Sequence, residues 1–246
     1  MRIVEDEKDV ESSFTMAQNE ARTAINDDRV FIERYIVQPR HIEIQILADH
    51  HGNVLYFPER ECSIQRRHQK VVEESPSTAV TPEIRTAMGE AAARLVEEAN
   101  YTNAGTLEFL LDASGEFYFM EVNTRLQVEH PVTEMVSGVD FLEWQLRIAS
   151  GEPLEMKLAD IADPKGHAIE CRVCAEDVYN KFLPDVGTVQ YMQLPEGEGV
   201  RNDSALYTGY EVTVHYDPMV SKLIVWAPDS ATCIERTRDA VNNYHL

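Results

Sequence analysis

Three side chains with oxygen atoms suited to a metal ion fall on two neighbouring runs that have the pattern of paired strands. Glu108 lies in one run, and Glu121 and Asn123 lie in the next. Residues two positions apart in a strand point to the same face, so we expect Glu121 and Asn123 side by side. Converging carboxylate and amide oxygens suit Mg²⁺, which binds one or two carboxylates together with substrate phosphates. Two solvated strand carboxylates are the alternative, and spacing alone leaves both interpretations open.

A polar loop follows the second run directly and places charged side chains in an otherwise apolar region. Its sequence, residues 123–131, is NTRLQVEHP. Arg125 carries the side chain best shaped to bind a small planar oxyanion through two parallel hydrogen bonds. Glu129, four residues on, is a candidate general base if its neighbours tune its pKa. Charges gathered without function on a surface loop are the alternative.

A basic segment at residues 60–70 stands out against an acidic chain. It contains four cations within eleven residues, namely Arg60, Arg66, Arg67 and Lys70. Such a cluster favours a polyanionic ligand, for example the phosphates of a nucleotide. A solvated face that balances Glu73 and Glu74 is the alternative.

Residues 171–174 form a C-x-x-C match that we do not interpret as a metal or redox site. In the strand-like run that contains them, Cys171 and Cys174 should point to opposite faces. The sequence has no second C-x-x-C that would complete a zinc site. We therefore expect buried thiols, and Arg172 between them is the more informative residue. The sequence also contains neither a P-loop nor a Rossmann glycine motif.

The charge of the chain excludes several classes of partner. Its 246 residues include 22 Lys or Arg and 43 Asp or Glu, which gives a net charge of −21. Nucleic acid or an anionic membrane surface requires a broad basic face, so neither is an expected partner. No apolar run approaches the roughly 18 residues that span a bilayer. Four cysteines do not make a disulfide framework in a chain of this length. We therefore expect a cytoplasmic protein, or one of an organelle matrix.

The order of elements predicts an α+β fold in two parts. Helices are expected at residues 5–28, 81–100 and 140–150, with a last one beginning near Asp229. Strands are expected at 30–36, 41–47, 54–57, 105–111, 117–123, 167–174, 187–194 and 219–226. A stretch at 154–166 that contains Pro164 and Gly166 is typical of a linker between the two parts.

Two long motifs resemble the signature sequences of biotin carboxylases. They are residues 60–74, RECSIQRRHQKVVEE, and residues 121–134, EVNTRLQVEHPVTE. Both share order and spacing with that family, and the likeness extends over essentially the whole chain. The resemblance implies an ATP-grasp carboxyl-terminal lobe followed by a biotin carboxylase carboxyl-terminal domain. The implied segments are a remnant of the ATP-grasp lid subdomain at 1–36, the catalytic lobe at 37–155, a linker at 156–166 and an incomplete carboxyl-terminal domain at 167–246.

The resemblance also implies which residues bind ligands. Those that would hold Mg²⁺ or Mn²⁺ are Glu108, Glu121 and Asn123. Those that would contact ATP are Glu33, Arg34, Ile36, His41, Gln65 and His68. Those that would bind bicarbonate are Arg125, Gln127 and Val128.

Catalytic roles follow from the same resemblance. Glu129 would remove the bicarbonate proton, so that the oxyanion attacks the γ-phosphate of ATP. Lys70 would lie near the bicarbonate and the phosphate, and Arg125 would hold the bicarbonate. Arg172 would stabilise negative charge on the ureido oxygen of biotin. Phosphoryl transfer needs such metal ions and cations more than covalent chemistry from the protein.

The implied function is ATP-dependent carboxylation of carrier-bound biotin with bicarbonate through carboxyphosphate, the first half-reaction of an acyl-CoA carboxylase. The implied partners are a biotin carboxyl carrier domain, a carboxyltransferase component and a second copy in a homodimer. Residues 216–224 and 244–246 favour the acyl-CoA branch over the pyruvate branch. In the family, a glycine-rich lid and two nucleotide-binding lysines precede the position of Met1. The alternatives are therefore a non-catalytic fragment that retains only binding or dimer contacts, or another ATP-grasp carboxylate ligase such as a carbamoyl phosphate synthetase.

Overall fold

The structure, a computed structural model, describes residues 2–246, whose contacts divide the chain into two compact units on either side of the Gln38–Pro39 bond. The first unit begins with a 3₁₀ turn, Glu7–Asp9, that leads into helix α1, Val10–Ile25. The helix predicted near residues 5–28 is thus confirmed.

The strand predicted at residues 30–36 is wrong. The run contains no strand and pairs with none of the strands in residues 2–246. Its central apolar side chains are exposed, with Phe31 at 79% and Ile32 at 74%. An apolar run becomes a strand only where a neighbouring strand satisfies its backbone hydrogen bonds, and sequence pattern alone does not report that neighbour.

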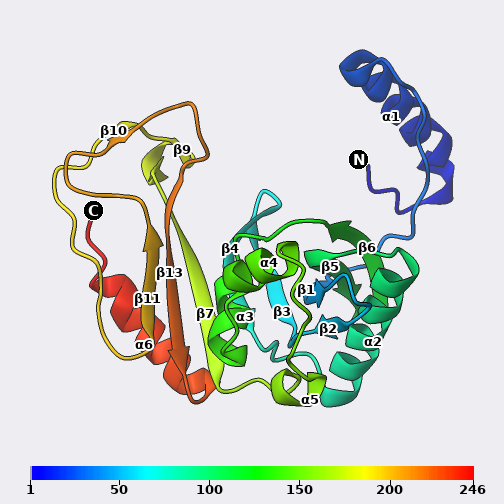
Figure 1. Ribbon diagram of the computed structural model, residues 1–246. Coiled ribbons are helices and arrows are strands. Elements are labelled where there is room, and N and C mark those ends of the chain that lie inside the picture. Colours follow the sequence, from blue (N-terminus) through cyan, green and yellow to red (C-terminus); the bar gives the residue numbers. More distant parts are fainter. Residues whose placement is uncertain (1) are drawn as a thin grey trace. The chain divides into compact units, whose positions relative to one another are not determined.

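The second unit is built on one antiparallel sheet of nine strands in the order β11-β13-β7-β4-β3-β1-β5-β6, with β2 paired to β1 (Figure 1). The bounds are β1 Arg40–Ala48, β2 Val54–Tyr56, β3 Arg60–Arg66, β4 Gln69–Ser75, β5 Asn103–Leu111, β6 Phe117–Asn123, β7 His167–Cys174, β11 Val200–Ser204 and β13 Met219–Ala227. Two small separate sheets pair β8, Glu176–Asp177, with β9, Leu183–Pro184, and β10, Gly187–Thr188, with β12, Glu211–Val212.

Five α-helices belong to the second unit as residues 39–246 describe it. They are α2 Pro82–Glu98, α3 His130–Ser137, α4 Phe141–Ala149, α5 Leu158–Ile161 and α6 Ser230–Asn242, and a 3₁₀ turn spans Val178–Asn180. Side-chain oxygens of Thr81, Asp140 and Asp229 accept backbone N–H groups at the starts of α2, α4 and α6. Such caps satisfy donors that a helix leaves free at its first turn, and they explain why these three helix starts could be predicted.

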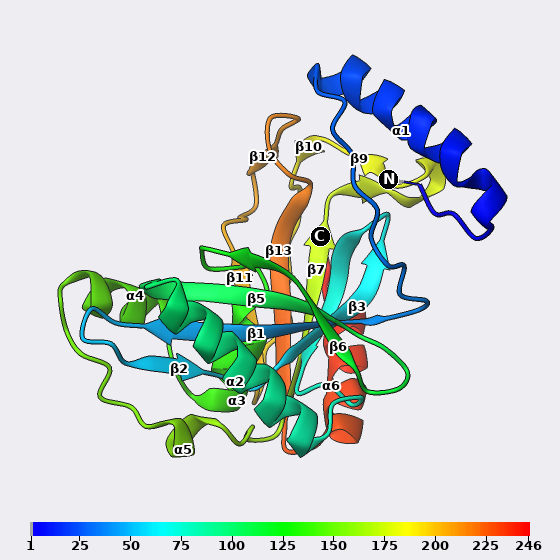
Figure 2. The ribbon, with the colours of Figure 1, turned by 90° about the vertical axis from the view of Figure 1, so that its right-hand side faces the viewer.

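The helices cover the two faces of the sheet with different partners. Ile42, Ile44 and Ile46 of β1 pack with apolar side chains of α2, which crosses β1 and β5 in Figure 2. Leu223 and Val225 of β13 pack in a cluster with α6 side chains, whereas Ile224 between them packs with α3. The second face of β1, opposite α2, carries buried polar side chains instead. That face is where a functional site can form inside the fold.

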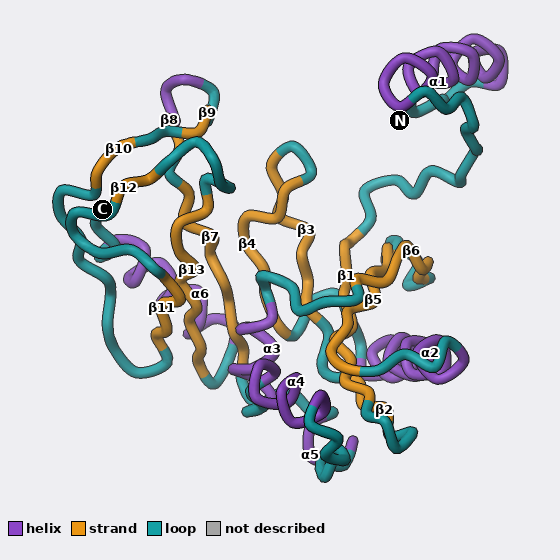
Figure 3. The backbone as a smooth tube through the Cα atoms, turned by 45° about the horizontal axis from the view of Figure 1, so that its top comes forward, coloured by secondary structure: helices purple, strands orange, loops and turns teal. Residues whose placement is uncertain are grey.

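Most predicted elements are confirmed, and the exceptions have local causes. The confirmed elements are the helices at 81–100, 140–150 and from Asp229, and the strands at 41–47, 54–57, 105–111, 117–123, 167–174 and 219–226. The prediction missed the β3–β4 hairpin (Figure 3), whose turn residues Arg67 and His68 have positive φ without the usual Asn-Gly signal. It also missed α3, and the strand expected at 187–194 reduces to the two residues of β10.

One sheet runs through the two predicted parts of the fold. Strand β4 pairs with β7, so residues before and after the predicted linker belong to the same hydrogen-bonded ladder. The linker itself contains the short helix α5. The α+β class is confirmed, and the individual domain boundaries stay predictions.

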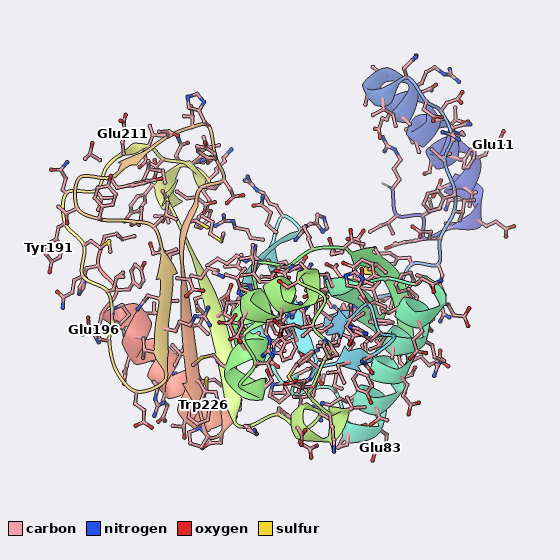
Figure 4. All side chains as sticks on the ribbon, viewed as in Figure 1. Glu11, Glu83, Tyr191, Glu196, Glu211 and Trp226 are labelled. Carbon is pink, nitrogen blue, oxygen red and sulfur yellow. The ribbon has the colours of Figure 1, made fainter. Side chains whose placement is uncertain are left out.

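The acidic excess of the sequence lies largely at the surface. Figure 4 shows Glu11, Glu83, Glu196 and Glu211 projecting outward from their elements, and all four are exposed. A separate group of glutamates is fully buried, among them Glu43, Glu73 and Glu170. Burying a carboxylate is costly unless it is paired, so the buried group marks the sites that the fold must balance.

Gly166 should be required for the entry into β7. Its φ is +77°, and a Cβ atom there would lie 2.4 Å from the carbonyl oxygen of Ala227. We predict that Gly166→Ala lowers the free energy of unfolding by about 2–4 kcal/mol, from backbone strain and overpacking together. Gly138→Ala is the matched control, because Gly138 has a φ of +75° with nothing within 4 Å. It should lose only about 1 kcal/mol in denaturant titration, and equal losses would contradict the prediction.

Candidate active site

A row of polar side chains occupies the face of β1 opposite α2. Glu43 and Gln45 are fully buried, although they alternate with apolar residues as the residues of a half-solvated strand would. The row continues across the sheet, because Glu43 lies opposite Glu108 and Gln45 opposite Thr106 on β5. The family resemblance assigned His41 of this row to the nucleotide, whereas Glu43 and Gln45 were not singled out from the sequence. The residue types did indicate a site, because His41, Glu43 and Gln45 place ionisable or hydrogen-bonding side chains on one face of the strand.

Arg60 is the buried centre of this network. Its side chain has no exposed surface, and it donates hydrogen bonds to side chains of β1, β5, the loop before α3, and α3 itself. The acceptors are Glu43 Oε2 at 3.2 Å, Gln45 Oε1 at 2.9 Å, and Thr106 Oγ1, Gln127 Oε1 and Thr133 Oγ1 each at 3.1 Å. Arg60 therefore joins the strands to the polar loop and cannot contact a ligand from this position.

The basic segment does not form a single patch, which corrects the expectation of a clustered phosphate site. Arg60 points into the sheet interior. Arg66 pairs with Glu176 at 2.5 Å and lies over the ring of Phe182. Lys70 points toward the polar row of β1. Arg60 lies at the start of β3 and Arg66 and Lys70 lie at the turn end of the β3–β4 hairpin, and register shifts between Glu61 and Gln65 change which way the later side chains point.

Lys70 lies among three carboxylates. Its Nζ contacts Glu43 and lies 2.7 Å from Glu129 Oε1 and 3.3 Å from Glu108 Oε1. Burial acts to lower the pKa of Lys70, but the charges of Glu43 and Glu129 outweigh it and raise the pKa. Burial likewise acts to raise the pKa of Glu43, and His41, Arg60 and Lys70 together hold it well below the ordinary value. Lys70 is thus a fixed cation in the site.

The predicted metal ligands meet at the β5–β6 pair. Glu108 lies directly opposite Glu121, and the Asn123 amide donates to Glu108 Oε1 at 2.8 Å and to Glu121 Oε1 at 3.4 Å. His41 Nε2 lies 2.8 Å from Glu108 Oε2. Burial acts to lower the pKa of His41, but Glu108 and Glu43 raise it to about 9. The two carboxylates fit Mg²⁺ or Mn²⁺, whereas Asn123 turns its NH₂ group toward them and its Oδ1 toward Arg125, so the amide would have to rotate to offer an oxygen ligand.

The loop before α3 is held from both sides. The Gln127 amide donates to Glu108 Oε1 at 2.8 Å, and the Val128 carbonyl accepts from Lys222 Nζ at 2.9 Å. Arg125 remains exposed and donates to Asn123 Oδ1 at 3.3 Å. Lys222 comes from β13, nearly a hundred residues later in the chain, and no local sequence pattern indicated its role.

Glu129 and Arg172 meet across the sheet. Arg172 of β7 donates from Nη2 to Glu129 Oε2 at 2.9 Å and from Nε to Glu73 Oε1 at 2.6 Å. Glu129 is 2% exposed and lies between the Lys70 ammonium and the Arg172 guanidinium. A carboxylate held between two fixed cations can accept a proton from a small anion that the same cations attract.

Most predicted site residues converge, and a few do not. Direct contacts link Lys70, Glu108, Asn123, Gln127, Glu129 and Arg172, and Gln65 joins through His41 Nδ1 at 3.1 Å. His68 lies at the exposed tip of the β3–β4 hairpin. Glu33, Arg34 and Ile36 belong to the first unit and are described only within it. Cys171 and Cys174 are free thiols, but both are half-buried, so the expectation of buried thiols is only partly met. Burial raises the pKa of Cys171 to about 11.

Comparison with known proteins identifies the family. Residues 1–157 match the family described as the ATP-binding domain of the carbamoyl-phosphate synthase L chain, and residues 170–246 match the biotin carboxylase C-terminal domain. The chain is 52% identical to biotin carboxylase of a Nostoc species over 98% of its own length. It is 50% identical to the human mitochondrial propionyl-CoA carboxylase alpha chain over 99% of its length.

The chain belongs to the biotin carboxylase family. A solved relative is the biotin carboxylase domain dimer of 2-oxoglutarate carboxylase from Hydrogenobacter thermophilus, in complex with Mg-ADP, ADP and bicarbonate. It superposes with a TM-score of 0.91 at 45% identity over 99% of this chain. The predicted class, a biotin carboxylase-type ATP-dependent ligase domain, is confirmed at the level of the family.

The chain spans only part of these relatives. It covers 54% of the Nostoc protein, 34% of the human protein and 54% of the Hydrogenobacter domain. Within residues 2–246, no helix combines the length and apolar character needed to cross a bilayer.

Removing Arg60 should destabilise the unit without any ligand present. Arg60→Met leaves the buried Glu43 without its guanidinium partner, so the free energy of unfolding should fall by about 3–5 kcal/mol in denaturant titration. Arg94→Met is the control, because Arg94 is exposed on α2 and should change stability by no more than about 0.5 kcal/mol. A loss for Arg60→Met as small as the control's would show that the buried network does not hold the site together.

Proposed function

We propose that this site catalyses ATP-dependent carboxylation of carrier-bound biotin by bicarbonate through carboxyphosphate. The observation that supports it most directly is the position of Glu129, a buried carboxylate with Lys70 at 2.7 Å and Arg172 at 2.9 Å. One acid between two fixed cations suits a reaction in which a small anion must lose a proton and then attack a phosphate. Family membership and the bicarbonate in the Hydrogenobacter complex favour the same assignment.

In the first step, bicarbonate loses its proton to Glu129. The resulting oxyanion attacks the γ-phosphorus of ATP, the bond to the β–γ bridging oxygen breaks, and ADP leaves. Arg125, Gln127 and the backbone of Val128 would hold the bicarbonate, and Lys70 would balance the charge on the transferred group. Electrostatic positioning of this kind supplies most of the catalysis in phosphoryl transfer.

A metal ion and the nucleotide would bind beside this centre. Glu108, Glu121 and Asn123 would hold Mg²⁺ or Mn²⁺, which supplies positive charge to the phosphate oxygens when bound. His41, Gln65 and His68 would contact the nucleotide from the second unit. The family resemblance assigns nucleotide contacts to Glu33, Arg34 and Ile36 as well.

In the second step, carboxyphosphate breaks into CO₂ and phosphate. The phosphate takes the N–H proton of the biotin ureido group, and the ureido nitrogen attacks CO₂ to form carboxybiotin. Arg172 would stabilise the negative charge that forms on the ureido oxygen. Because carboxyphosphate also reacts with water, the burial of Glu129 and Gln127 protects the intermediate.

The assigned partners are part of the same proposal. Carboxybiotin requires a biotin carboxyl carrier domain and a carboxyltransferase that receives the carboxyl group. The human relative is a propionyl-CoA carboxylase chain and the Hydrogenobacter relative belongs to a 2-oxoglutarate carboxylase, so the proposal of an acyl-CoA acceptor is supported only by residues 216–224 and 244–246. The dimeric Hydrogenobacter domain favours a homodimer.

Glu129→Gln should abolish the first step. The glutamine amide has the same shape but cannot accept the bicarbonate proton. Bicarbonate-dependent ATP cleavage by the full-length protein should therefore fall by about 10²–10⁴-fold. Glu90→Gln is the control, because Glu90 is an exposed glutamate of α2. The measurement is release of ADP with and without bicarbonate and free biotin. Activity within a few-fold of the unsubstituted protein would exclude Glu129 as the base.

Arg172→Ala should separate the two steps. Stimulation of ATP cleavage by free biotin should fall by about 10²-fold or more, because the ureido oxyanion loses its cation. Bicarbonate-dependent cleavage without biotin should decrease less. Arg94→Ala is the matched control. Unchanged stimulation by biotin would contradict the role of Arg172, and ATP cleavage that never depends on biotin would favour another ATP-grasp carboxylate ligase.

A further inference from the structure

Two buried glutamates lie next to Arg172 and have no part in the steps above. Glu73 of β4 is paired with Glu170 of β7, and both are fully buried. Glu170 precedes Arg172 by two positions in the same strand, so the two side chains share a face of the sheet. The two glutamates are therefore neighbours of Arg172, the residue assigned to biotin, on the same face of the sheet.

Only one of the four carboxylate oxygens of Glu73 and Glu170 accepts a hydrogen bond from the described residues. Arg172 Nε donates to Glu73 Oε1 at 2.6 Å. The second oxygen of Glu73 and both oxygens of Glu170 are buried and accept no hydrogen bond from any of residues 2–246. Lys222 on the same face donates to the carbonyl of Val128 and lies 3.5 Å from Asp203, and its charge offsets only part of the rise in the pKa of Glu170. The guanidinium of Arg172 thus pairs with Glu73, whereas Glu170 has no hydrogen-bonded partner among residues 2–246.

The carboxyl groups of Glu73 and Glu170 cannot both be ionised at this buried place in the sheet. A buried carboxylate without hydrogen bonds is costly, and a second negative charge nearby increases that cost. Burial raises the pKa of Glu73 to about 7 despite the opposing charge of Arg172. Burial and the charge of Glu73 raise the pKa of Glu170 well above its ordinary value. Glu73 is paired with Arg172 and can therefore be ionised, whereas Glu170 has no such partner and keeps its proton.

We propose that Glu73 is a positioning residue that fixes the Arg172 guanidinium for the biotin ureido oxygen, and that Glu170 is its protonated partner. The proposal rests on the proposed function for the identity of that ligand. Glu73 and Glu129 take two of the five N–H donors of Arg172, and three donors remain for a ligand. A neutral Glu170 leaves the positive charge of Arg172 available at the ureido oxygen.

The kinetic test uses the Glu73→Gln variant of the full-length protein. The amide still accepts a hydrogen bond but lacks the charge, so kcat/KM for free biotin should fall by about 10–100-fold. The KM for ATP and the bicarbonate-dependent cleavage without biotin should stay within about twofold. Glu74→Gln is the matched control, because Glu74 is the next residue of β4, points to the other face and pairs with His167. It should leave kcat/KM for biotin within about twofold.

A second variant covers the case in which Glu73→Gln does not fold. Glu73→Asp keeps the charge but withdraws the carboxylate from Arg172, and it should show the same selective loss in kcat/KM for biotin. Equal losses with and without biotin would identify a merely structural residue and overturn the proposal. Unchanged kcat/KM for biotin in Glu73→Gln would overturn it as well.

The protonation of Glu170 has a test that needs no activity. At about pH 8, the infrared difference between the unsubstituted protein and Glu170→Gln should contain the carbonyl stretch of a protonated carboxylic acid. The bands of an ionised carboxylate in its place would overturn this part of the proposal. If the unsubstituted polypeptide cleaves no ATP in response to bicarbonate, the proposed function fails, whereas the infrared result still decides the state of Glu170.

Discussion

The charge balance on one buried face of the sheet is the constraint on which the site depends. Five glutamates with little or no exposed surface gather there, namely Glu43, Glu73, Glu108, Glu129 and Glu170. Three cations, Arg60, Lys70 and Arg172, lie among them and make direct contacts with four of the five. Unpaired buried charge is far more costly than a lost surface ion pair, so each cation has few alternative positions. The arrangement of side chains in the candidate site is a consequence of this balance.

The antiparallel order of the strands brings the charges together from distant parts of the chain. Lys70 and Glu73 lie on β4, between β3 with Arg60 and β7 with Arg172. The polar loop reaches the same face because α3 packs against β4, β7 and β13, and Lys222 of β13 fixes the loop carbonyl at Val128. Apolar packing with α2 and α6 completes the fold on the other side, which leaves the polar face free for chemistry.

The predictable part of the site was the part carried by local motifs. The strand pair that brings Glu108, Glu121 and Asn123 together follows from alternation and a turn, and it is confirmed by direct pairing. Helix starts at Thr81, Asp140 and Asp229 follow from their capping side chains. These features depend on neighbours in sequence, which pattern analysis can read.

The remainder depends on partners far away in the chain. The sequence presented Arg60, Arg66 and Lys70 as one basic cluster, but burial, Glu176 and Glu129 separate them into three environments. The run at 30–36 has the composition of a strand and no strand partner among the described residues. The pairing of Glu73 with Glu170 requires knowledge that β4 and β7 are neighbours, which no local pattern contains.

The central claim is that bicarbonate itself, deprotonated at Glu129, attacks the γ-phosphate. Oxygen tracing tests it most directly: the full-length protein is given ¹⁸O-labelled bicarbonate together with unlabelled ATP and free biotin. If the claim is correct, the released phosphate carries one oxygen atom from bicarbonate. Phosphate that takes its new oxygen from water instead would show that the site hydrolyses ATP without forming carboxyphosphate, and would contradict the account.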